Sequence, residues 1–323
     1  MYLLLMLLVA FVSFLITFLA FPVIIPRLKK VGIIGKNMHS EKQEEVPEMG
    51  GMVMVAGFSA GIISIIFLKI FYKLLPEVSL IALLATLSTV LIVALIGIFD
   101  DLFSMRQITK AFLPVFAALP LMAIKIGDSI LNIPTIGRID FGVLYPLALV
   151  PLGITGATNA FNMLAGFNGL EVGLGLVCMF TVSTIAFMLG EMTALLISLS
   201  CLGVLVATIY YNWYPAKVLV GDIGTLCMGS VLAICVIVGN FETAGVILII
   251  PFVVDFTIKA IYGFPYTFGV YKDGKLYCPD DGPKGLAHII LKLFGGMKET
   301  NLVMVLIGIE AVFGVSAILF YYF

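Results

Sequence analysis

Acidic side chains interrupt the apolar pattern of this sequence at two separate places. Asp100 and Asp101 stand side by side at the end of one long apolar run, and Asp222 lies near the start of another. An ionisable residue in or beside such a run is a functional candidate, because burying its charge is costly. Two adjacent carboxylates near Lys110 have the chemistry to handle a cation or a phosphate. The alternative is an ordinary solvated helix end.

A second group of polar residues lies in the segment Thr158–Glu171, which contains three asparagines. Asn159 and Asn162 are spaced to share one face of a helix, and Asn168 follows in a glycine-containing stretch. Amide groups at the edge of an apolar run are unfavourable unless they form hydrogen bonds. They either bind a ligand or join neighbouring helices.

The donor atoms in these groups favour a hard cation. Asn and Asp supply oxygen, and the two histidines and five cysteines of the chain show no metal-ligand spacing. Magnesium uses one or two protein oxygens and completes its shell with water and phosphate oxygens. Because the soluble nucleotide-binding glycine motifs are absent, a phosphate substrate would have to be held at the site itself.

The composition identifies the elements that carry these groups as membrane helices. The 323 residues are 62% hydrophobic and 11% charged, with a mean hydropathy of +1.18, whereas a soluble domain has about 25% charged residues. The net charge of −1 gives no electrostatic reason to expect a nucleic-acid partner. We therefore expect a protein that resides in a lipid bilayer.

The expected fold is an all-α polytopic membrane protein, built as a single domain over residues 1–323. A membrane-spanning helix needs about 20 apolar residues. Pro146 and Pro151 interrupt the fifth candidate, which membrane helices tolerate when neighbours satisfy the freed carbonyls. Ten candidate spans are found, at residues 1–26, 50–71, 79–99, 111–127, 141–160, 170–190, 192–211, 218–239, 243–263 and 301–323.

The basic residues predict the orientation of these ten spans. Lysine and arginine are enriched on the cytoplasmic side of membrane proteins. One set of loops holds four of the 18 basic residues, namely Lys69, Lys73, Lys125 and Arg138, and the other set holds the remaining fourteen. The polar groups lie on the richer side, so the sequence predicts a cytoplasmic site and both termini outside.

The last cytoplasmic loop is expected to contain two ordered elements. Asp273-Gly274 within 270–277 is typical of a tight hairpin turn. After it, Leu286, Ile289, Ile290 and Leu293 recur at helical spacing, which predicts an amphipathic helix in the membrane interface. The lone His288 is interpreted as a surface residue.

Five segments, in order along the chain, resemble the polyprenyl-phosphate N-acetylhexosamine-1-phosphate transferases. They are Val46–Gly51, Phe99–Asp101, Thr158–Glu171, Asn212–Asp222 and Lys298–Leu302. Within that family they look most like the eukaryotic and archaeal branch, whose members transfer GlcNAc-1-phosphate from UDP-GlcNAc to dolichyl phosphate and release UMP as the first step of N-glycan lipid carrier synthesis. The resemblance implies ten helices with a cytoplasmic active site, and we expect a cell-membrane location. A homodimer is one of the oligomeric states that the sequence leaves open.

The resemblance also implies roles for individual residues. Asn162 and Asp222 would hold Mg²⁺, with Mn²⁺ as a substitute. Lys110 would bind the phosphate of the lipid acceptor, Asp100 and Asp101 are acidic family residues of the catalytic group, and 155–163 would line the acceptor groove. The residues implied around the nucleotide are Met38, Glu48, Asn159, Gly166, Asn168 and Leu219.

Three alternatives remain open at this point. The chain lacks the arginine-containing group of the eukaryotic enzyme, since the similar place reads Phe264-Pro265-Tyr266-Thr267-Phe268, so another UDP-N-acetylhexosamine would fit the same chemistry. Transfer would be direct, or Asp100 or Asp101 would act as a nucleophile in two steps. A secondary transporter is the alternative outside enzymes, and it predicts polar groups at the bilayer midplane and an inverted repeat.

Overall fold

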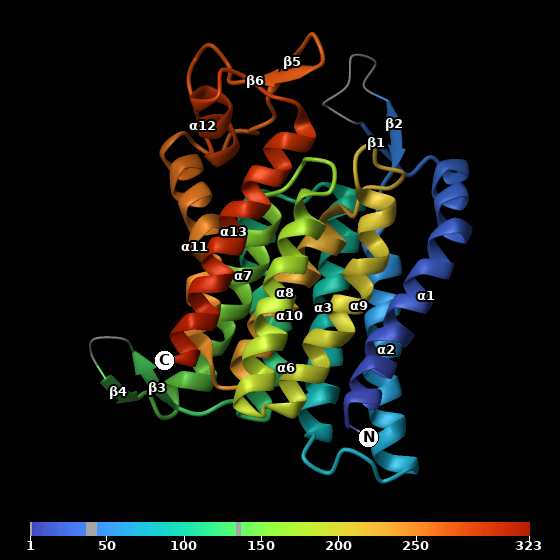
Figure 1. The fold of residues 1–323 in the computed structure, drawn as a ribbon, viewed down its shortest axis with the longest axis vertical. Coiled ribbons are helices and arrows are strands. Elements are labelled where there is room, and N and C mark those ends of the chain that lie inside the picture. Colours follow the sequence, from blue (N-terminus) through green and yellow to red (C-terminus); the bar gives the residue numbers. More distant parts are fainter. Residues whose placement is uncertain (1, 37–43, 134–136) are drawn as a thin grey trace.

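The computed structural model describes residues 2–36, 44–133 and 137–323. Long helices run side by side along the longest axis of the molecule (Figure 1). The helices are α1 Tyr2–Val31, α2 Gly51–Phe71, α3 Leu80–Phe103, α4 Gln107–Phe112, α5 Pro114–Ala117, α6 Leu119–Ala123, α7 Val150–Met163, α8 Leu170–Leu189, α9 Met192–Asn212, α10 Gly221–Val238, α11 Glu242–Ile261, α12 Leu286–Leu293 and α13 Glu299–Tyr322, with one π-helical turn, η1, at Tyr145–Leu149. The strands are β1 Ile34–Lys36, β2 Glu45–Pro47, β3 Ile130–Ile133, β4 Gly137–Asp140, β5 Val270–Lys272 and β6 Lys275–Tyr277.

The described residues contain eight helices long and apolar enough to cross a membrane, namely α1, α2, α3, α8, α9, α10, α11 and α13. Each coincides with one of the spans expected from the sequence. A helix satisfies all of its backbone hydrogen bonds internally, which is what a segment surrounded by hydrocarbon requires. The structure therefore confirms an all-α polytopic membrane protein.

The fourth and fifth expected spans are built from shorter pieces. Residues 111–127 do not form one helix, because Pro114 and Pro120 each lie at the beginning of a new short helix, α5 and α6. Proline lacks the backbone donor that would continue the preceding helix and is favoured in a first turn. In the fifth span Pro146 lies in η1, and Pro151 lies in the first turn of α7.

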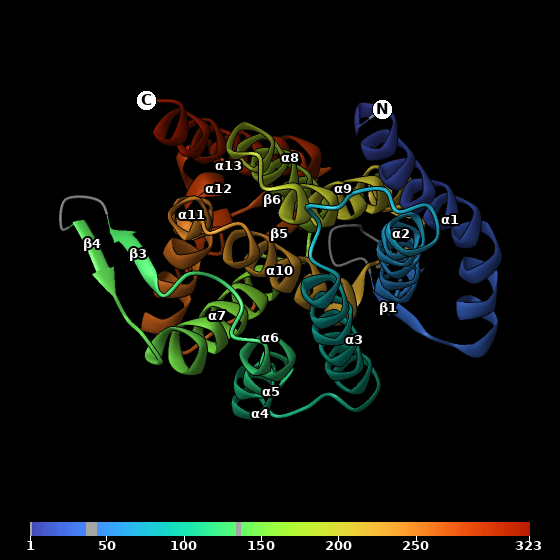
Figure 2. The same cartoon turned by 90° about the horizontal axis from the view of Figure 1, so that it is seen from below.

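Helix α10 lies in the middle of the bundle, between α3, α7 and α9 (Figure 2). Of its apolar window 83% is buried, against 28% for the peripheral α1. Glycines let the backbones approach closely: a Cβ on Gly97 of α3 would lie 2.5 Å from Ile223 Cα, and one on Gly229 of α10 would lie 2.3 Å from Ala157 O of α7. These contacts fix α3 and α7 against α10.

The two ends of the bundle differ. Both termini and the β3–β4 hairpin lie at one end, and β1–β2, β5–β6 and α12 lie at the other (Figure 1). The last turn of α3, the end of α7 and the beginning of α10 meet near this second end. The residues predicted to do chemistry are carried by those three helix ends.

The last loop contains the expected elements, with one error of burial. Strands β5 and β6 pair through Lys272 and Lys275, and Asp273 and Gly274 both have positive φ. Helix α12 forms at the expected residues: Ile290 is buried against the protein, whereas Leu293 is exposed on the outer surface. His288 is buried, so its interpretation as a surface residue is wrong: its Nε2 lies 2.9 Å from Phe268 O.

Candidate active site

The side chain of Asp101 caps the first turn of α10. Asp101 Oδ1 accepts a hydrogen bond from Asp222 N at 2.8 Å, and its Oδ2 accepts one from Ile223 N at 3.4 Å. The first amides of a helix have no partner within the helix, and a carboxylate there is favoured by the helix dipole. Asp101 therefore joins the end of α3 to the beginning of α10 and orients Asp222.

This cap leaves no room for a side chain at residue 221. Gly221 has φ of +67°, and an added Cβ would lie 2.6 Å from Asp101 Oδ2. Gly221→Ala is expected to destabilise the protein by about 1–2 kcal/mol from backbone conformation alone, and to lower its thermal unfolding midpoint in detergent. In the control Gly308→Ala a Cβ meets nothing within 4 Å, so an unchanged or higher midpoint is expected. Equal midpoints for the two variants would contradict the cap.

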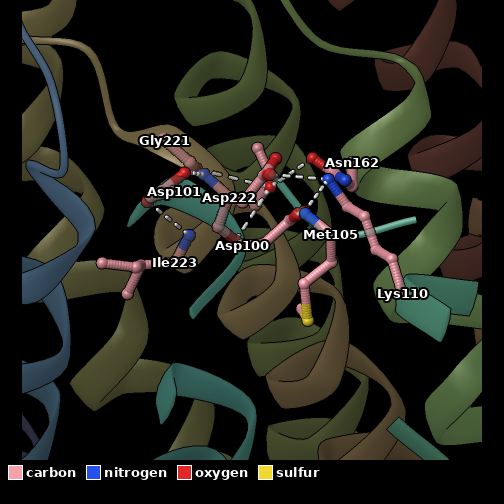
Figure 3. A network of polar contacts seen from close by, with 9 residues as sticks. Asp100, Asp101, Met105, Lys110, Asn162, Gly221, Asp222 and Ile223 are labelled. Atoms are coloured by element: carbon pink, nitrogen blue, oxygen red, sulfur yellow. Dashed lines mark hydrogen bonds and ion pairs between the residues drawn. The ribbon is translucent and has the colours of Figure 1, made fainter. Parts of the chain in front are cut away.

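Lys110 connects two carboxylates from different helices. Its Nζ lies 2.6 Å from Asp222 Oδ2 and also forms an ion pair with Asp100. The other oxygen of Asp100 accepts a hydrogen bond from Met105 N at 2.9 Å, which holds the loop between α3 and α4. The three charged groups point toward one another from α3, α4 and α10 (Figure 3).

Asn162 reaches the same place from the end of α7. Its Oδ1 accepts a hydrogen bond from Thr225 Oγ1 at 2.9 Å, and the same hydroxyl lies 3.2 Å from Asp222 O. One threonine therefore links Asn162 to the first turn of α10, and Asn162 lies beside Lys110 and Asp222 in the cluster (Figure 3). Thr225 was missed in the sequence, where a threonine within an apolar helix carries no distinguishing signal.

Glu48 and Leu219 meet beside this cluster. Leu219 N donates to Pro47 O at 2.8 Å, and Gly50 N donates to Leu219 O at 2.9 Å, so the segment before α2 is fixed to the segment before α10. A Cβ on Gly35 would lie 3.0 Å from Glu48 Oε2 and 3.1 Å from Leu219 Cδ1.

Burial raises the pKa of the Glu48 carboxyl above its usual value of 4.5. The unfolded chain ionises first as the pH rises, so stability is lost between pH 4.5 and the raised pKa of the folded state. Glu48→Gln is therefore expected to have a higher thermal unfolding midpoint than the wild type at neutral pH, and an equal midpoint at pH values below the usual pKa. A constant difference across this range would contradict the burial of an ionised Glu48.

Two further residues that the sequence analysis placed around the nucleotide are Asn159 and Met38. Asn159 Nδ2 donates to Ala111 O at 3.0 Å and to Thr155 O at 2.8 Å, so it fixes α7 to α4. These contacts are those of a residue that joins two helices, which is the alternative to ligand binding considered for the asparagines of this segment. Met38 lies outside the described residues.

Gly166 and Asn168 form a second group with two glutamates. Asn168 donates to Glu299 Oε1 from its backbone N at 2.7 Å and from its Nδ2 at 2.8 Å, and Gly166 N donates to Glu171 Oε1 at 2.6 Å. These glutamates shape the loop that follows Asn162. The sequence offered a signal for both, because Glu171 and Glu299 are acidic residues within two of the five recognised segments.

A bundle of membrane helices with an aspartate, lysine and asparagine cluster at one end defines a polytopic membrane protein with a polar site at one face. Residues 81–240 match the family described as Glycosyl transferase family 4. This match includes Asp100, Asp101, Lys110, Asn162 and Asp222.

Several curated proteins are similar to the chain over most of its length. A candidate UDP-N-acetylglucosamine–dolichyl-phosphate N-acetylglucosaminephosphotransferase of Saccharolobus solfataricus is 37% identical, covering 95% of this chain and 94% of its own. The UDP-N-acetylglucosamine–dolichyl-phosphate N-acetylglucosaminephosphotransferase of Schizosaccharomyces pombe is 30% identical, and the aligned part covers 76% of this chain and 63% of that protein. The phospho-N-acetylmuramoyl-pentapeptide-transferase of Streptococcus thermophilus is 30% identical, over 81% of each. The chain belongs to glycosyl transferase family 4 and is a membrane-embedded glycosyl phosphotransferase.

Proposed function

We propose that this protein transfers GlcNAc-1-phosphate from UDP-GlcNAc to a polyprenyl phosphate of the dolichyl type and releases UMP. The observation that carries the proposal is the position of Lys110, held between Asp100 and Asp222 at a site that Asn162 also reaches. Phosphoryl transfer depends mainly on positioning and on neutralising negative charge. Lys110, together with a divalent cation held at this site, would supply both.

The reaction we propose is a direct displacement. An oxygen of the lipid phosphate attacks the β-phosphorus of the UDP-sugar, and the bond from that phosphorus to the bridging oxygen breaks as UMP leaves. Lys110 orients and neutralises the attacking phosphate, which is largely dianionic at neutral pH and needs no strong base. In support, Asp101 uses both oxygens to cap α10, and Asp100 is engaged by Met105 N and Lys110, so neither is placed as a free nucleophile.

We further propose that Asn162 and Asp222 hold Mg²⁺. Thr225 Oγ1 donates to Asn162 Oδ1 and lies 3.2 Å from the backbone oxygen of Asp222, so the two residues are held at neighbouring positions, and each offers a side-chain oxygen. Such a sparse donor set fits Mg²⁺, which completes its octahedron with water and phosphate oxygens. When bound, the ion neutralises charge on the pyrophosphate, and Mn²⁺ would substitute.

The active site is proposed to face the cytoplasm, with both termini outside. Of the 17 basic residues that the structure describes, thirteen lie in the loops and helix ends of the end that carries β1–β2, β5–β6 and α12. Homodimer formation stays a prediction.

Purified protein incubated with radiolabelled UDP-GlcNAc, Mg²⁺ and dolichyl phosphate is expected to move label into the organic phase, with one UMP released per lipid labelled. Chelation with EDTA should stop transfer, and added Mg²⁺ should restore it. A protein that binds UDP but labels no lipid would contradict the proposal. Label recovered on the protein in the absence of lipid would instead support the two-step route through Asp100 or Asp101.

A different sugar is the second candidate. The segment Phe264–Phe268 lacks arginine, and one similar protein is named for a muramoyl-pentapeptide substrate. Competition of unlabelled UDP-N-acetylhexosamines against labelled UDP-GlcNAc tests this candidate. Stronger competition by another sugar than by UDP-GlcNAc itself would reassign the donor.

A further inference from the structure

A buried ion pair lies near the end of α11, outside the cluster described above. Asp255 Oδ2 lies 2.7 Å from Lys259 Nζ, one helical turn away, and the two side chains are 1% and 8% exposed. Burying two charges costs free energy that their attraction offsets only when further hydrogen bonds satisfy both groups. The partners of these two side chains therefore indicate what the pair does.

Lys259 binds the end of α7. Its Nζ donates a hydrogen bond to Met163 O at 2.5 Å. Met163 is the last residue of α7 and directly follows Asn162. The last carbonyls of a helix lack partners within the helix, and a cation is favoured there by the helix dipole. A lysine from α11 thus fixes the helix end that carries Asn162.

Asp255 binds the last loop. Its Oδ1 accepts a hydrogen bond from Leu286 N, the first residue of α12, at 2.8 Å. A Cβ on Gly285 would lie 3.0 Å from this oxygen and 2.7 Å from Thr267 Cγ2. The beginning of α12 is therefore packed against this carboxylate, and Gly285, just before α12, also lies close to Thr267.

The last loop in turn lies on the loop that follows α7. A Cβ on Gly166 would lie 2.7 Å from Phe268 Cε1. Gly166 lies in the loop that follows α7, shortly after Asn162 in the sequence. Phe268 stacks on the exposed ring of Tyr266, with 5.7 Å between centroids. The ion pair thus lies where α7, α11 and the last loop meet.

We infer that Asp255 and Lys259 are positioning residues for the transferase site. Through Met163 O and Leu286 N, they hold the end of α7 and the last loop in one fixed arrangement, so that Asn162 and the loop at Gly166 keep the geometry needed to bind the nucleotide. The inference rests on the proposed function, because only a role of Asn162 in binding makes this arrangement matter for transfer.

The decisive variant removes the charges while keeping the contact to α12. In Asp255→Asn/Lys259→Met the asparagine oxygen still accepts from Leu286 N, whereas the ion pair and the bond from Lys259 to Met163 O are lost. Neutral replacement of a buried pair leaves stability nearly unchanged, so the unfolding midpoint should stay near wild type. Because small misplacements at an active site cost up to about a hundredfold in rate, we expect kcat to fall roughly tenfold to a hundredfold and UDP to bind more weakly.

Further variants separate positioning from stability. Lys259→Met alone leaves Asp255 unpaired, so it should lose both activity and thermal stability. Lys259→Arg keeps a donor and should recover part of the activity. Ser198→Ala, which removes a buried hydrogen bond to Ser183 elsewhere in the bundle, is the matched control and should retain wild-type kcat. Wild-type kcat and UDP affinity in the double variant would overturn the inference.

Hydrogen exchange of the ligand-free protein gives a readout independent of the reaction. The double variant should exchange faster at the amides of 164–169, with α10 unchanged. Faster exchange spread evenly over the bundle, or none at 164–169, would overturn the inference. If the wild type transferred no sugar, the proposed function would fail, whereas this comparison would still decide whether Lys259 holds the end of α7.

Discussion

Asp222→Ala is expected to lower transfer by about a thousandfold, the scale found when a group that stabilises developing charge is removed. The carboxylate is 2.6 Å from Lys110 Nζ, so its loss removes both an anchor for the lysine and a proposed metal ligand. The measurement is label transfer from UDP-GlcNAc to lipid, with thermal unfolding followed in parallel.

The fold should survive this substitution. The first turn of α10 is capped by Asp101, which binds the backbone amides of residues 222 and 223 and not the Asp222 side chain. Asp281→Ala is a matched control, because Asp281 also pairs with one lysine, Lys284, but is exposed in the last loop. Near-normal transfer by Asp222→Ala, or an equal loss in Asp281→Ala, would remove Asp222 from the site.

The membrane helices were predictable because their signal is local. Twenty or so apolar residues in a row require a helix whatever the rest of the chain does, and eight expected spans are single helices. The breaks within 111–127 were also local: Pro114 and Pro120 were visible, and each lies in the first turn of a new short helix. Hydropathy alone reports that a segment is apolar and not whether it is continuous.

The contacts of the site were not predictable in the same way. Asp101 was selected for its charge, but its role as a cap for α10 depends on a contact across 121 positions of sequence. Glu48 and Leu219 likewise meet only because the backbone at Pro47 and Gly50 pairs with that at Leu219. Composition and spacing identify residues that are costly to bury, and the packing of the helices decides which of them meet.

Glycine residues within the apolar helices allow the long-range contacts of the site to form. Gly97 and Gly229 place α3 and α7 against α10 at distances that any side chain would prevent. The three helix ends that carry Asp101, Asn162 and Asp222 can meet only because of this close packing. The polar cluster at one end of the bundle therefore depends on small residues within the apolar part of the sequence, where a motif search finds no chemistry.

Lys110→Met is expected to lower transfer by about a hundredfold to a thousandfold. The substitution keeps an unbranched side chain only one atom shorter and removes its charge, which leaves Asp100 and Asp222 facing each other without a cation. If Lys110 binds the lipid phosphate, KM for the acceptor should rise while UDP affinity changes less. Initial rates measured at varied lipid and at varied UDP-GlcNAc separate these two effects.

We expect the activity of Lys110→Met to fall because of the lost shape of the ammonium group as well as its lost charge. Lys110→Arg separates these two causes. Arginine keeps the positive charge but presents a planar group that cannot occupy the place of a single ammonium between two carboxylates, so recovery should be partial. Lys284→Met, at a half-buried lysine of the last loop that pairs with Asp281, should leave both KM values unchanged. A rise in KM for UDP-GlcNAc alone would move Lys110 from the acceptor to the nucleotide. In that case the cation between Asp100 and Asp222 would serve the departing UMP, and the attacking lipid phosphate would need another partner at this end of the bundle.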